Sequence, residues 1–304
     1  MPLRSLLFIP ATSERFVASA AKRGADAVIL DLEDSIAPEA KVAARAALAV
    51  HVPRLVGEGV TVFVRVNGGD LAADDFAAAT LPGVTAILVP KIESAAALRD
   101  AQRALNAAER LNGLARCAIG VIALLEGPNA VLDARSIAAV GGSLIGLGFG
   151  SEDFAAAMGV RPTVESLLVP AQMVAMAARG AGVQSFGLPG SIAGFQDLEE
   201  LGALAAKARA IGFTGAVCIH PAQVPIINAA FSPSAEELAW AQAVVEAFDA
   251  ALARGESAVA VQGRMVDPPV YEQAKRLLGQ TSRGVQSAGD SEKMGHVIKL
   301  FPSP

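Results

Sequence analysis

Cysteine and histidine, the residues that most often hold zinc or form disulfides, are scarce in this chain. Its 304 residues include two cysteines and three histidines, and their spacing matches no zinc-binding motif. Cys117 and Cys218 both lie in apolar runs, so we expect reduced, buried thiols without a catalytic role. A disulfide-stabilised fold and a Cys/His metal centre are therefore both disfavoured.

Long apolar runs and an excess of positive charge are also missing. Although 53% of the residues are hydrophobic, no run approaches the ~18 residues that span a bilayer. The first apolar run ends at Pro10, too early for the core of a signal peptide. The net charge of −5 implies no basic face for nucleic acid or an anionic membrane. We therefore expect a cytoplasmic protein that binds neither.

Short apolar runs recur along the first two-thirds of the chain. We interpret eight of them as strands, at residues 5–9, 27–32, 61–66, 86–90, 118–125, 144–149, 184–188 and 216–219. Each is apolar throughout, which is typical of parallel strands that are buried on both faces. Stretches of helical character lie between them, among them residues 13–23, 38–50, 95–110 and 194–211.

Eight strands that alternate with helices predict an α/β fold of the (β/α)8, or TIM barrel, type, for which ~250 residues is typical. A doubly wound open sheet is the alternative, but no G-x-G-x-x-G motif follows the first strand. After the last strand the pattern changes to a long helix at 234–254, a strand or hairpin at 258–266 and a second helix from Asp267 to about residue 278. We expect a barrel at 1–231 and a helical extension at 232–304.

Charged residues follow the apolar runs at the ends where barrel enzymes carry their active sites. The candidates, in chain order, are Glu33, Asp34, Arg65, Lys91, Glu126 and Asp153. Burying a lone charge costs several kcal/mol, so such groups must pair, bind a metal ion or bind substrate. A network of structural salt bridges is the simpler interpretation of any one of them. The excess of acid in the whole set favours a metal site.

The metal predicted for this rim is a hard cation, because every candidate ligand is an oxygen. Mg²⁺ fits best, with Mn²⁺ as a substitute, and two carboxylates completed by water and substrate oxygens are a usual way of holding it. Glu126 and Asp153 are the two carboxylates that we assign to it. Arg65 can clamp a carboxylate or stabilise a developing enolate oxygen at the same rim.

Several motifs occur together and in order along almost the whole chain. They are RSLLFIP at 4–10, GADAVILDLED at 24–34, VRVN at 64–67, VPKIE at 89–93, Glu126 with its apolar lead-in, GSEDF at 150–154, CIHPAQ at 218–223 and MVDPP at 265–269. This set resembles the citrate lyase β-subunit-like branch of the HpcH/HpaI aldolase superfamily, which includes malyl-CoA and citramalyl-CoA lyases.

The resemblance implies a TIM barrel with Mg²⁺ held by Glu126 and Asp153, and with Glu33 and Asp34 beside the waters of the metal. It implies further that Arg65 contacts substrate oxygens. The substrate would be a thioester of CoA or of an acyl carrier, together with a 2-oxo acid. We expect a homo-oligomer, either a homotrimer or a hexamer of trimers.

Two further assignments follow from the same resemblance, for Arg15 and Asp267. Arg15 would contact polar parts of the thioester. We also assign Glu33, Asp34 and Lys91, which stand at the same rim as Arg65, to substrate binding. Asp267 would reach the site of a neighbouring subunit as acid/base, which would explain the extension. A helix N-cap before two prolines is the structural explanation for Asp267, and both roles are compatible.

Two departures from the family pattern bear on these expectations. Ala157 stands where many relatives carry a second aspartate after the metal ligand, so a contact that supports the metal is lost. The loop after Pro10 is Ala-Thr-Ser where many relatives have Gly-Asp, which leaves the choice between CoA and an acyl carrier open.

The predicted reaction is reversible cleavage of a 3-hydroxyacyl thioester, such as malyl-CoA, citramalyl-CoA or a citryl thioester, into a 2-oxo acid and an acyl thioester. A CoA-independent class II aldolase is one alternative. That chemistry uses a histidine near the metal, whereas His51 falls at the second predicted helix and His220 lies at the rim. A non-catalytic subunit of a citrate lyase-like complex is the other alternative.

Overall fold

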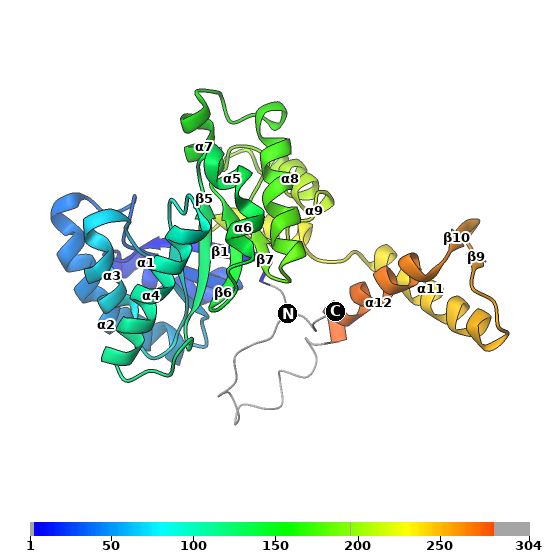
Figure 1. Cartoon of the computed structure of the whole chain (residues 1–304), viewed down its shortest axis with the longest axis horizontal. Coiled ribbons are helices and arrows are strands. Elements are labelled where there is room, and N and C mark those ends of the chain that lie inside the picture. Colours follow the sequence, from blue (N-terminus) through cyan, green and yellow to red (C-terminus); the bar gives the residue numbers. More distant parts are fainter. Residues whose placement is uncertain (1–2, 195, 283–304) are drawn as a thin grey trace. The chain divides into compact units, whose positions relative to one another are not determined.

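The computed structural model describes residues 3–194 and 196–282, which divide into two compact units. The first unit is Leu3–Phe231, and the second begins at Ser232 (Figure 1). Within the described residues, no helix is both long enough and apolar enough to cross a bilayer. The expected extension continues to residue 304, and its part beyond residue 282 lies outside the described residues.

The first unit is built around eight parallel strands. They are β1 (Ser5–Pro10), β2 (Ala27–Asp31), β3 (Val62–Arg65), β4 (Val84–Val89), β5 (Gly120–Leu125), β6 (Leu144–Phe149), β7 (Gln184–Phe186) and β8 (Ala216–Cys218). Each strand pairs with the next from β1 to β7, and β8 returns to pair with β1. A parallel bridge between Phe186 and Gly215 links the two ends of the sheet. The predicted TIM barrel is confirmed.

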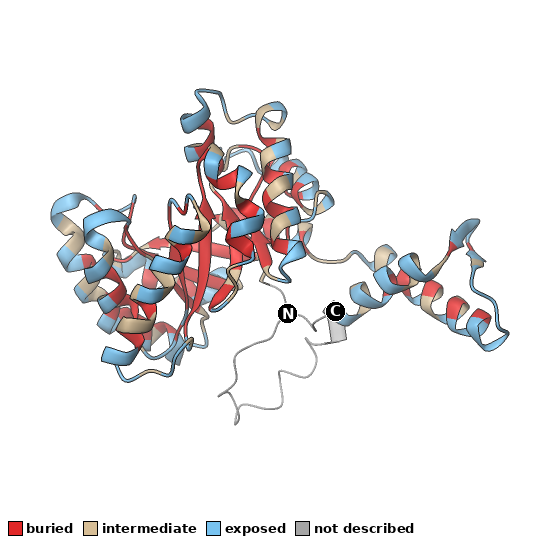
Figure 2. Ribbon diagram, in the orientation of Figure 1, coloured by how far each residue is buried: buried red, intermediate tan, exposed pale blue. Residues whose placement is uncertain are grey.

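Two apolar layers fill the barrel unit, because alternate residues of a strand point to opposite faces. The larger layer lies between the strands and the helices around them. The smaller layer fills the interior and consists of Leu6, Ala27, Ile29, Phe63, Ala86, Leu88, Ile122, Leu124 and Phe186. The strands are buried along almost their whole length (Figure 2). This explains why the apolar runs in the sequence show no alternation.

Helices connect the strands. They are α1 (Glu14–Val17), α2 (Lys41–Gly57), α3 (Ala72–Ala79), α4 (Ala95–Leu111), α5 (Pro128–Leu132), α6 (Ala134–Ala138), α7 (Ser151–Met158), α8 (Val164–Gly180), α9 (Leu198–Ala210) and α10 (Gln223–Ala230). Short 3₁₀ turns occur at Ala20–Arg23, Pro38–Ala40 and Gly69–Leu71.

Three of the predicted helices have different limits in the structure. The segment 13–23 is not one helix, because α1 ends at Val17 and a separate 3₁₀ turn follows. The helix expected at 38–50 begins as a 3₁₀ turn and then runs on to Gly57, past Pro53. The helix expected at 194–211 begins only at Leu198, where the Asp197 side chain accepts a hydrogen bond from the N–H of Glu200.

The second unit is a small helical hairpin with its own apolar cluster. It contains α11 (Ala235–Ala253), a two-stranded antiparallel hairpin of β9 (Val259–Val261) and β10 (Arg264–Val266), and α12 (Pro268–Ser282). Phe248 of α11 stacks on Tyr271 of α12, with 4.7 Å between the ring centroids. Asp267 caps α12, because its carboxylate accepts a hydrogen bond from the N–H of Val270. The N-cap explanation for Asp267 therefore holds.

Candidate functional site

Charged side chains continue the interior layer at the carboxyl end of the barrel. The last apolar residues that β2, β3 and β5 point into the barrel are Ile29, Phe63 and Leu124. Two positions further along each segment stand Asp31, Arg65 and Glu126, respectively. Strand pairing places Asp31 directly beside Arg65. Because the side-chain period of a strand is two, these charges form the next layer above the apolar interior. The same alternation of side chains that fills the barrel with apolar residues therefore also points these charged residues into its carboxyl end.

Arg65 is held by three carboxylates. Its Nε and Nη2 atoms donate to the two oxygens of Asp31 at 2.6 and 2.7 Å, and its Nη1 atom lies 3.0 Å from Glu33 and from Asp34. The guanidinium stacks over the ring of Phe8 at 4.5 Å. Although burial acts in the opposite direction, the hydrogen bond and charge of Arg65 hold the pKa of Asp31 below its ordinary value.

Glu126 is the most perturbed acid of the rim. Its side chain is buried, and Oε2 accepts a 2.8 Å hydrogen bond from the backbone N–H of Lys91. Burial raises the pKa of Glu126 to about 7, and the charges of Asp153 and Glu33 act in the same direction against the Lys91 hydrogen bond. These three carboxylates therefore lie within electrostatic range of one another.

Close packing around Glu126 depends on a glycine. A Cβ atom at Gly150, which follows β6, would lie 2.6 Å from Cγ of Glu126. Asp153 stands one turn further on, exposed in the first turn of α7. Over the described part of the chain, no three His, Cys, Asp or Glu side chains come together as a complete metal site. A pair of carboxylates that leaves the remaining positions to water or substrate is a usual arrangement for Mg²⁺.

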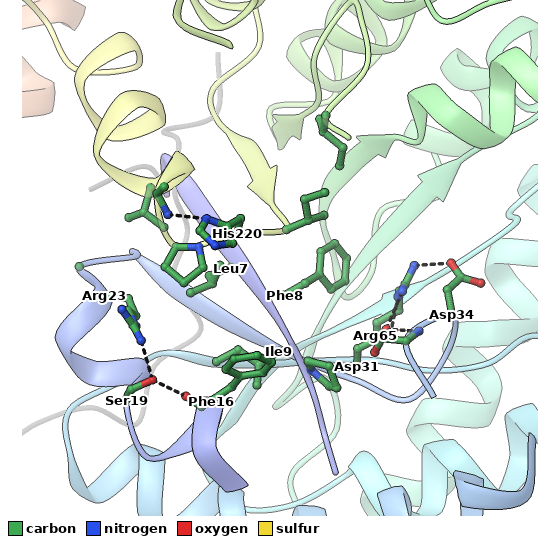
Figure 3. A pocket seen from close by; sticks show the side chains of 18 of the residues that line it. Leu7, Phe8, Ile9, Phe16, Ser19, Arg23, Asp31, Asp34, Arg65 and His220 are labelled. Carbon is green, nitrogen blue, oxygen red and sulfur yellow. Dashed lines mark hydrogen bonds and ion pairs between the residues drawn. The ribbon is translucent and has the colours of Figure 1, made fainter. Parts of the chain in front are cut away.

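A large cavity opens beside this rim. It has a volume of about 1230 Å³, and its lining includes Asp34, Arg65 and Asp153. On the side away from Arg65 lie Ser19 and Arg23, where Arg23 donates to the Ser19 hydroxyl (Figure 3). Asp31 and Asp34 thus lie with Arg65 on one side of the cavity, and Arg23 lies on the other (Figure 3).

The basic side of the cavity comes from the segment after β1. Arg15 lies in α1, stacked on Phe16 at 4.8 Å, and Lys22 and Arg23 lie in the 3₁₀ turn that follows. All three cations are exposed, so they remain hydrated and available to an anion. His220, which follows β8, also lines this cavity. Arg15, which we expect to contact the thioester, lies in the lining of this cavity.

Lys91 and Glu33 face a second hollow of about 810 Å³ on the other side of the rim. The ammonium of Lys91 is 3.5 Å from Glu33, and this charge raises the pKa of Lys91. Asp34 lines both hollows. The structure brings together Glu33, Asp34, Arg65, Lys91, Glu126 and Asp153. His51, by contrast, lies on α2 beside Glu14.

A buried hydrogen-bond network beneath the rim was not predicted from the sequence. The Lys41 ammonium donates to the carbonyl oxygens of Leu32 and Glu33 at 2.7 and 2.6 Å and to Asn67 at 2.8 Å. Asn67 in turn donates to Asp75, which has no exposed surface. The network fixes the turn that carries Glu33. Lys41 gives no signal in the sequence, because a lysine in the first turn of a helix is usually solvated.

Asp31 was also not singled out as a site residue. It stands in the same acidic run as Glu33 and Asp34, and only the tertiary structure identifies it as the bidentate partner of Arg65. The Ser35 hydroxyl donates to it as well, at 2.6 Å. Ala157 lies on the exposed face of α7, one turn after Asp153.

Comparison with known proteins supplies the family context. The family described as HpcH/HpaI aldolase/citrate lyase matches residues 4–221. A (3S)-malyl-CoA thioesterase of Cereibacter sphaeroides is 34% identical, over 88% of this chain and 90% of that protein.

Two solved structures from Mycobacterium tuberculosis, one of them a crystal structure of CitE, are similar to this chain. The protein in complex with magnesium, acetoacetate and coenzyme A aligns with a TM-score of 0.72 and 32% identity, over 92% of this chain and 98% of that one. The citrate lyase β subunit complexed with oxaloacetate and magnesium aligns with a TM-score of 0.63 and 31% identity, over 76% and 98% of the two chains.

Proposed function

This chain belongs to the HpcH/HpaI aldolase/citrate lyase family, and we propose that it is a Mg²⁺-dependent carbon–carbon lyase. Its substrate would be a 3-hydroxyacyl thioester of CoA or of an acyl carrier, cleaved to a 2-oxo acid and an acyl thioester. Malyl, citramalyl and citryl thioesters are the candidates. Relatives bound to coenzyme A, oxaloacetate and magnesium support this class of substrate.

The single observation that carries the proposal is the state of Glu126. Burial raises the pKa of this carboxyl group to about 7, which means that the surrounding protein does not fully stabilise its negative charge. The hydrogen bond to Glu126 from Lys91 comes from its backbone N–H, and the Arg65 guanidinium donates to Asp31, so the charges of these two cations do not offset the burial of Glu126. A divalent cation between Glu126 and Asp153 would supply the missing charge.

The donor set fits Mg²⁺. Glu126 and Asp153 would hold the ion, and Glu33 would bind its waters. When bound, the ion supplies Lewis-acid polarisation of the substrate oxygens. The choice between Mg²⁺ and Mn²⁺ depends on availability as well as on these oxygen ligands.

The residues of the chain would divide the remaining work. Nη1 of Arg65 faces the exposed Asp34, and a substrate carboxylate that displaced Asp34 would gain this donor. Lys91 would contact the same substrate from the other side of Glu33. The exposed cations Arg15, Lys22 and Arg23 would bind the anionic part of the thioester carrier. Asp267 of a neighbouring copy would return a proton to carbon.

A panel of thioesters tests the proposal. Malyl-CoA, citramalyl-CoA and citryl-CoA would be incubated with the protein, with and without Mg²⁺, and both the 2-oxo acid and free CoA would be measured. We expect Mg²⁺-dependent release of a 2-oxo acid with the acyl thioester intact. Release of free CoA without an oxo acid would instead indicate a thioesterase, the activity named for the Cereibacter relative.

The same panel separates the other two candidates. Turnover of a free hydroxy-oxo acid without any thioester would indicate a CoA-independent aldolase. Binding of oxaloacetate or pyruvate with Mg²⁺ but without turnover would indicate a non-catalytic subunit.

A further inference from the structure

The barrel has one weak seam, between β7 and β8. Both strands have only three residues, and the described chain between them is paired only around the isolated bridge of Phe186 and Gly215. There the N–H of Gly187 donates to Gly215, and the N–H groups of Thr214 and Gly215 donate to Ser185. The loops that continue from these strands toward the cavity, at 187–194 and 219–222, show no backbone hydrogen bonds to one another among the described residues. Both loops line the substrate-sized cavity.

The side chain of Gln223 connects these two loops. It is 1% exposed at the start of α10. Its Oε1 atom accepts from the N–H groups of Ile219 and His220 at 2.8 and 3.2 Å, and its Nε2 atom donates to the carbonyl oxygen of Ile192 at 3.0 Å. Ile192, Ile219 and His220 all line the cavity.

The loop after β7 is also held on its other side. The Ser191 hydroxyl donates to the carboxylate of Glu152, which precedes Asp153. A continuous run of hydrogen bonds therefore passes from the acidic rim through Ser191 and Ile192 to Gln223. The buried amide of Gln223 uses both its donor and its acceptor here, so its loss would leave three partly buried backbone groups without these partners.

We propose that Gln223 is a positioning residue that joins the two loops beyond the Phe186–Gly215 bridge, where strand pairing has ended, and fixes the wall of the substrate cavity. It does not touch the reacting atoms. Its effect on kinetics rests on the proposed function, whereas its effect on the two loops does not. Loosening the wall lowers the affinity for the thioester more than it slows the chemical step, because Asp31 and Glu126 keep their own hydrogen bonds, to Arg65 and to the N–H of Lys91.

The test compares Gln223→Met with Gln184→Met, a matched control. Gln184 is also a buried glutamine on this seam, 2% exposed, but it lies at the opposite end of β7, where it bonds to Leu3 and Thr214. Both substitutions remove an amide of the same size. Thermal stability, steady-state kinetics on the thioester that the wild type turns over, and hydrogen exchange at 188–194 and 219–222 are measured.

We expect Gln223→Met to raise KM for the thioester about tenfold, with kcat within about threefold of wild type, and to speed exchange in both loops. Gln184→Met should lower stability to a similar extent but leave KM and exchange in the two loops unchanged. If the two variants change KM and loop exchange equally, Gln223 has no positioning role and the inference is wrong.

A second variant removes only one of the three bonds. Gln223→Glu keeps an acceptor for Ile219 and His220 but places a carboxylate against the Ile192 carbonyl. Faster exchange should then be confined to 188–194, and unchanged exchange there would overturn the inference even if Gln223→Met fails to fold. If the wild type turns over no thioester, the proposed function fails, while the exchange measurements still decide the role of Gln223.

Discussion

The backbone N–H of Lys91 donates a 2.8 Å hydrogen bond to Oε2 of the buried Glu126. Lys91 adopts φ of +54°, a left-handed conformation that is unfavourable for a residue with a side chain. This conformation turns the amide toward the acid that we assign to the metal. The chain thus keeps a strained residue at the site where its N–H is needed.

Lys91→Gly should therefore stabilise the protein relative to Lys91→Ala. Both remove the ammonium, but only glycine relieves the left-handed strain, which costs about 1 kcal/mol. Urea denaturation of the two variants measures the difference. An alanine variant as stable as the glycine variant would show that φ at Lys91 stores no strain.

Glu126 should make the metal-free protein less stable as the pH rises. Its folded pKa of about 7 lies above the ordinary 4.5, so the folded state binds more protons than the unfolded state between these values. Stability should fall through this window, by about 3 kcal/mol in total. Glu126→Gln, which keeps an acceptor for Lys91, should stabilise the EDTA-treated protein at pH 8 and leave it unchanged at pH 4. Equal effects at both pH values would contradict the raised pKa.

Removing Arg65 should destabilise the fold, because it leaves the buried carboxylate of Asp31 without its partner. Asp31 is 1% exposed, and a buried carboxylate without its partner costs about 3–5 kcal/mol. Arg65→Met should show this loss in chemical denaturation, and adding Asp31→Asn should recover most of it, because the charge is gone.

Turnover should stay about 10²-fold or more below wild type in both of these variants if Arg65 contacts substrate as we propose. Arg103→Met, which breaks an exposed ion pair with Asp100, is the control and should change neither stability nor turnover measurably. If turnover recovers in the double variant, Arg65 does not contact substrate.

Asp153→Ala should abolish the stabilisation by Mg²⁺. A ligand at 100 times its Kd stabilises a protein by about 2.7 kcal/mol, which thermal unfolding with and without Mg²⁺ detects. Glu199→Gln, at an exposed acid of α9, should keep the full Mg²⁺ effect. If Asp153→Ala keeps full Mg²⁺-dependent turnover, the metal assignment is wrong.

Asp267→Asn separates the two roles assigned to Asp267. Asparagine is as good an N-cap as aspartate, so the helix α12 should keep its stability, whereas Asp267→Ala should lose about 1 kcal/mol. An acid/base role would make both variants inactive. Normal turnover of Asp267→Asn would leave Asp267 only its observed role as the cap of α12.

Much of the barrel could be predicted because the sequence patterns that indicate its strands and rim residues lie in short, continuous segments. The eight apolar runs and the acids and arginine that follow them lie in short segments, and the ends of parallel strands meet at one rim. Strand limits shifted by a residue or two, since strand ends depend on pairing. The break between α1 and the 3₁₀ turn at Ala20–Arg23 could not be predicted, because such short pieces are stabilised by tertiary packing, here of the buried Val17 and Ala20, rather than by their own propensity.

By itself, the sequence determined which strand ends carry charge and that oxygen ligands, not thiols or imidazoles, gather there. Only the tertiary structure decided how these charges are paired. Asp31 rather than Glu33 binds Arg65 through two parallel hydrogen bonds, and Glu126 is buried while Asp153 is exposed. The physical reason is that pairing and burial depend on loop conformation, such as the left-handed turn at Lys91, and on contacts between residues far apart in the chain.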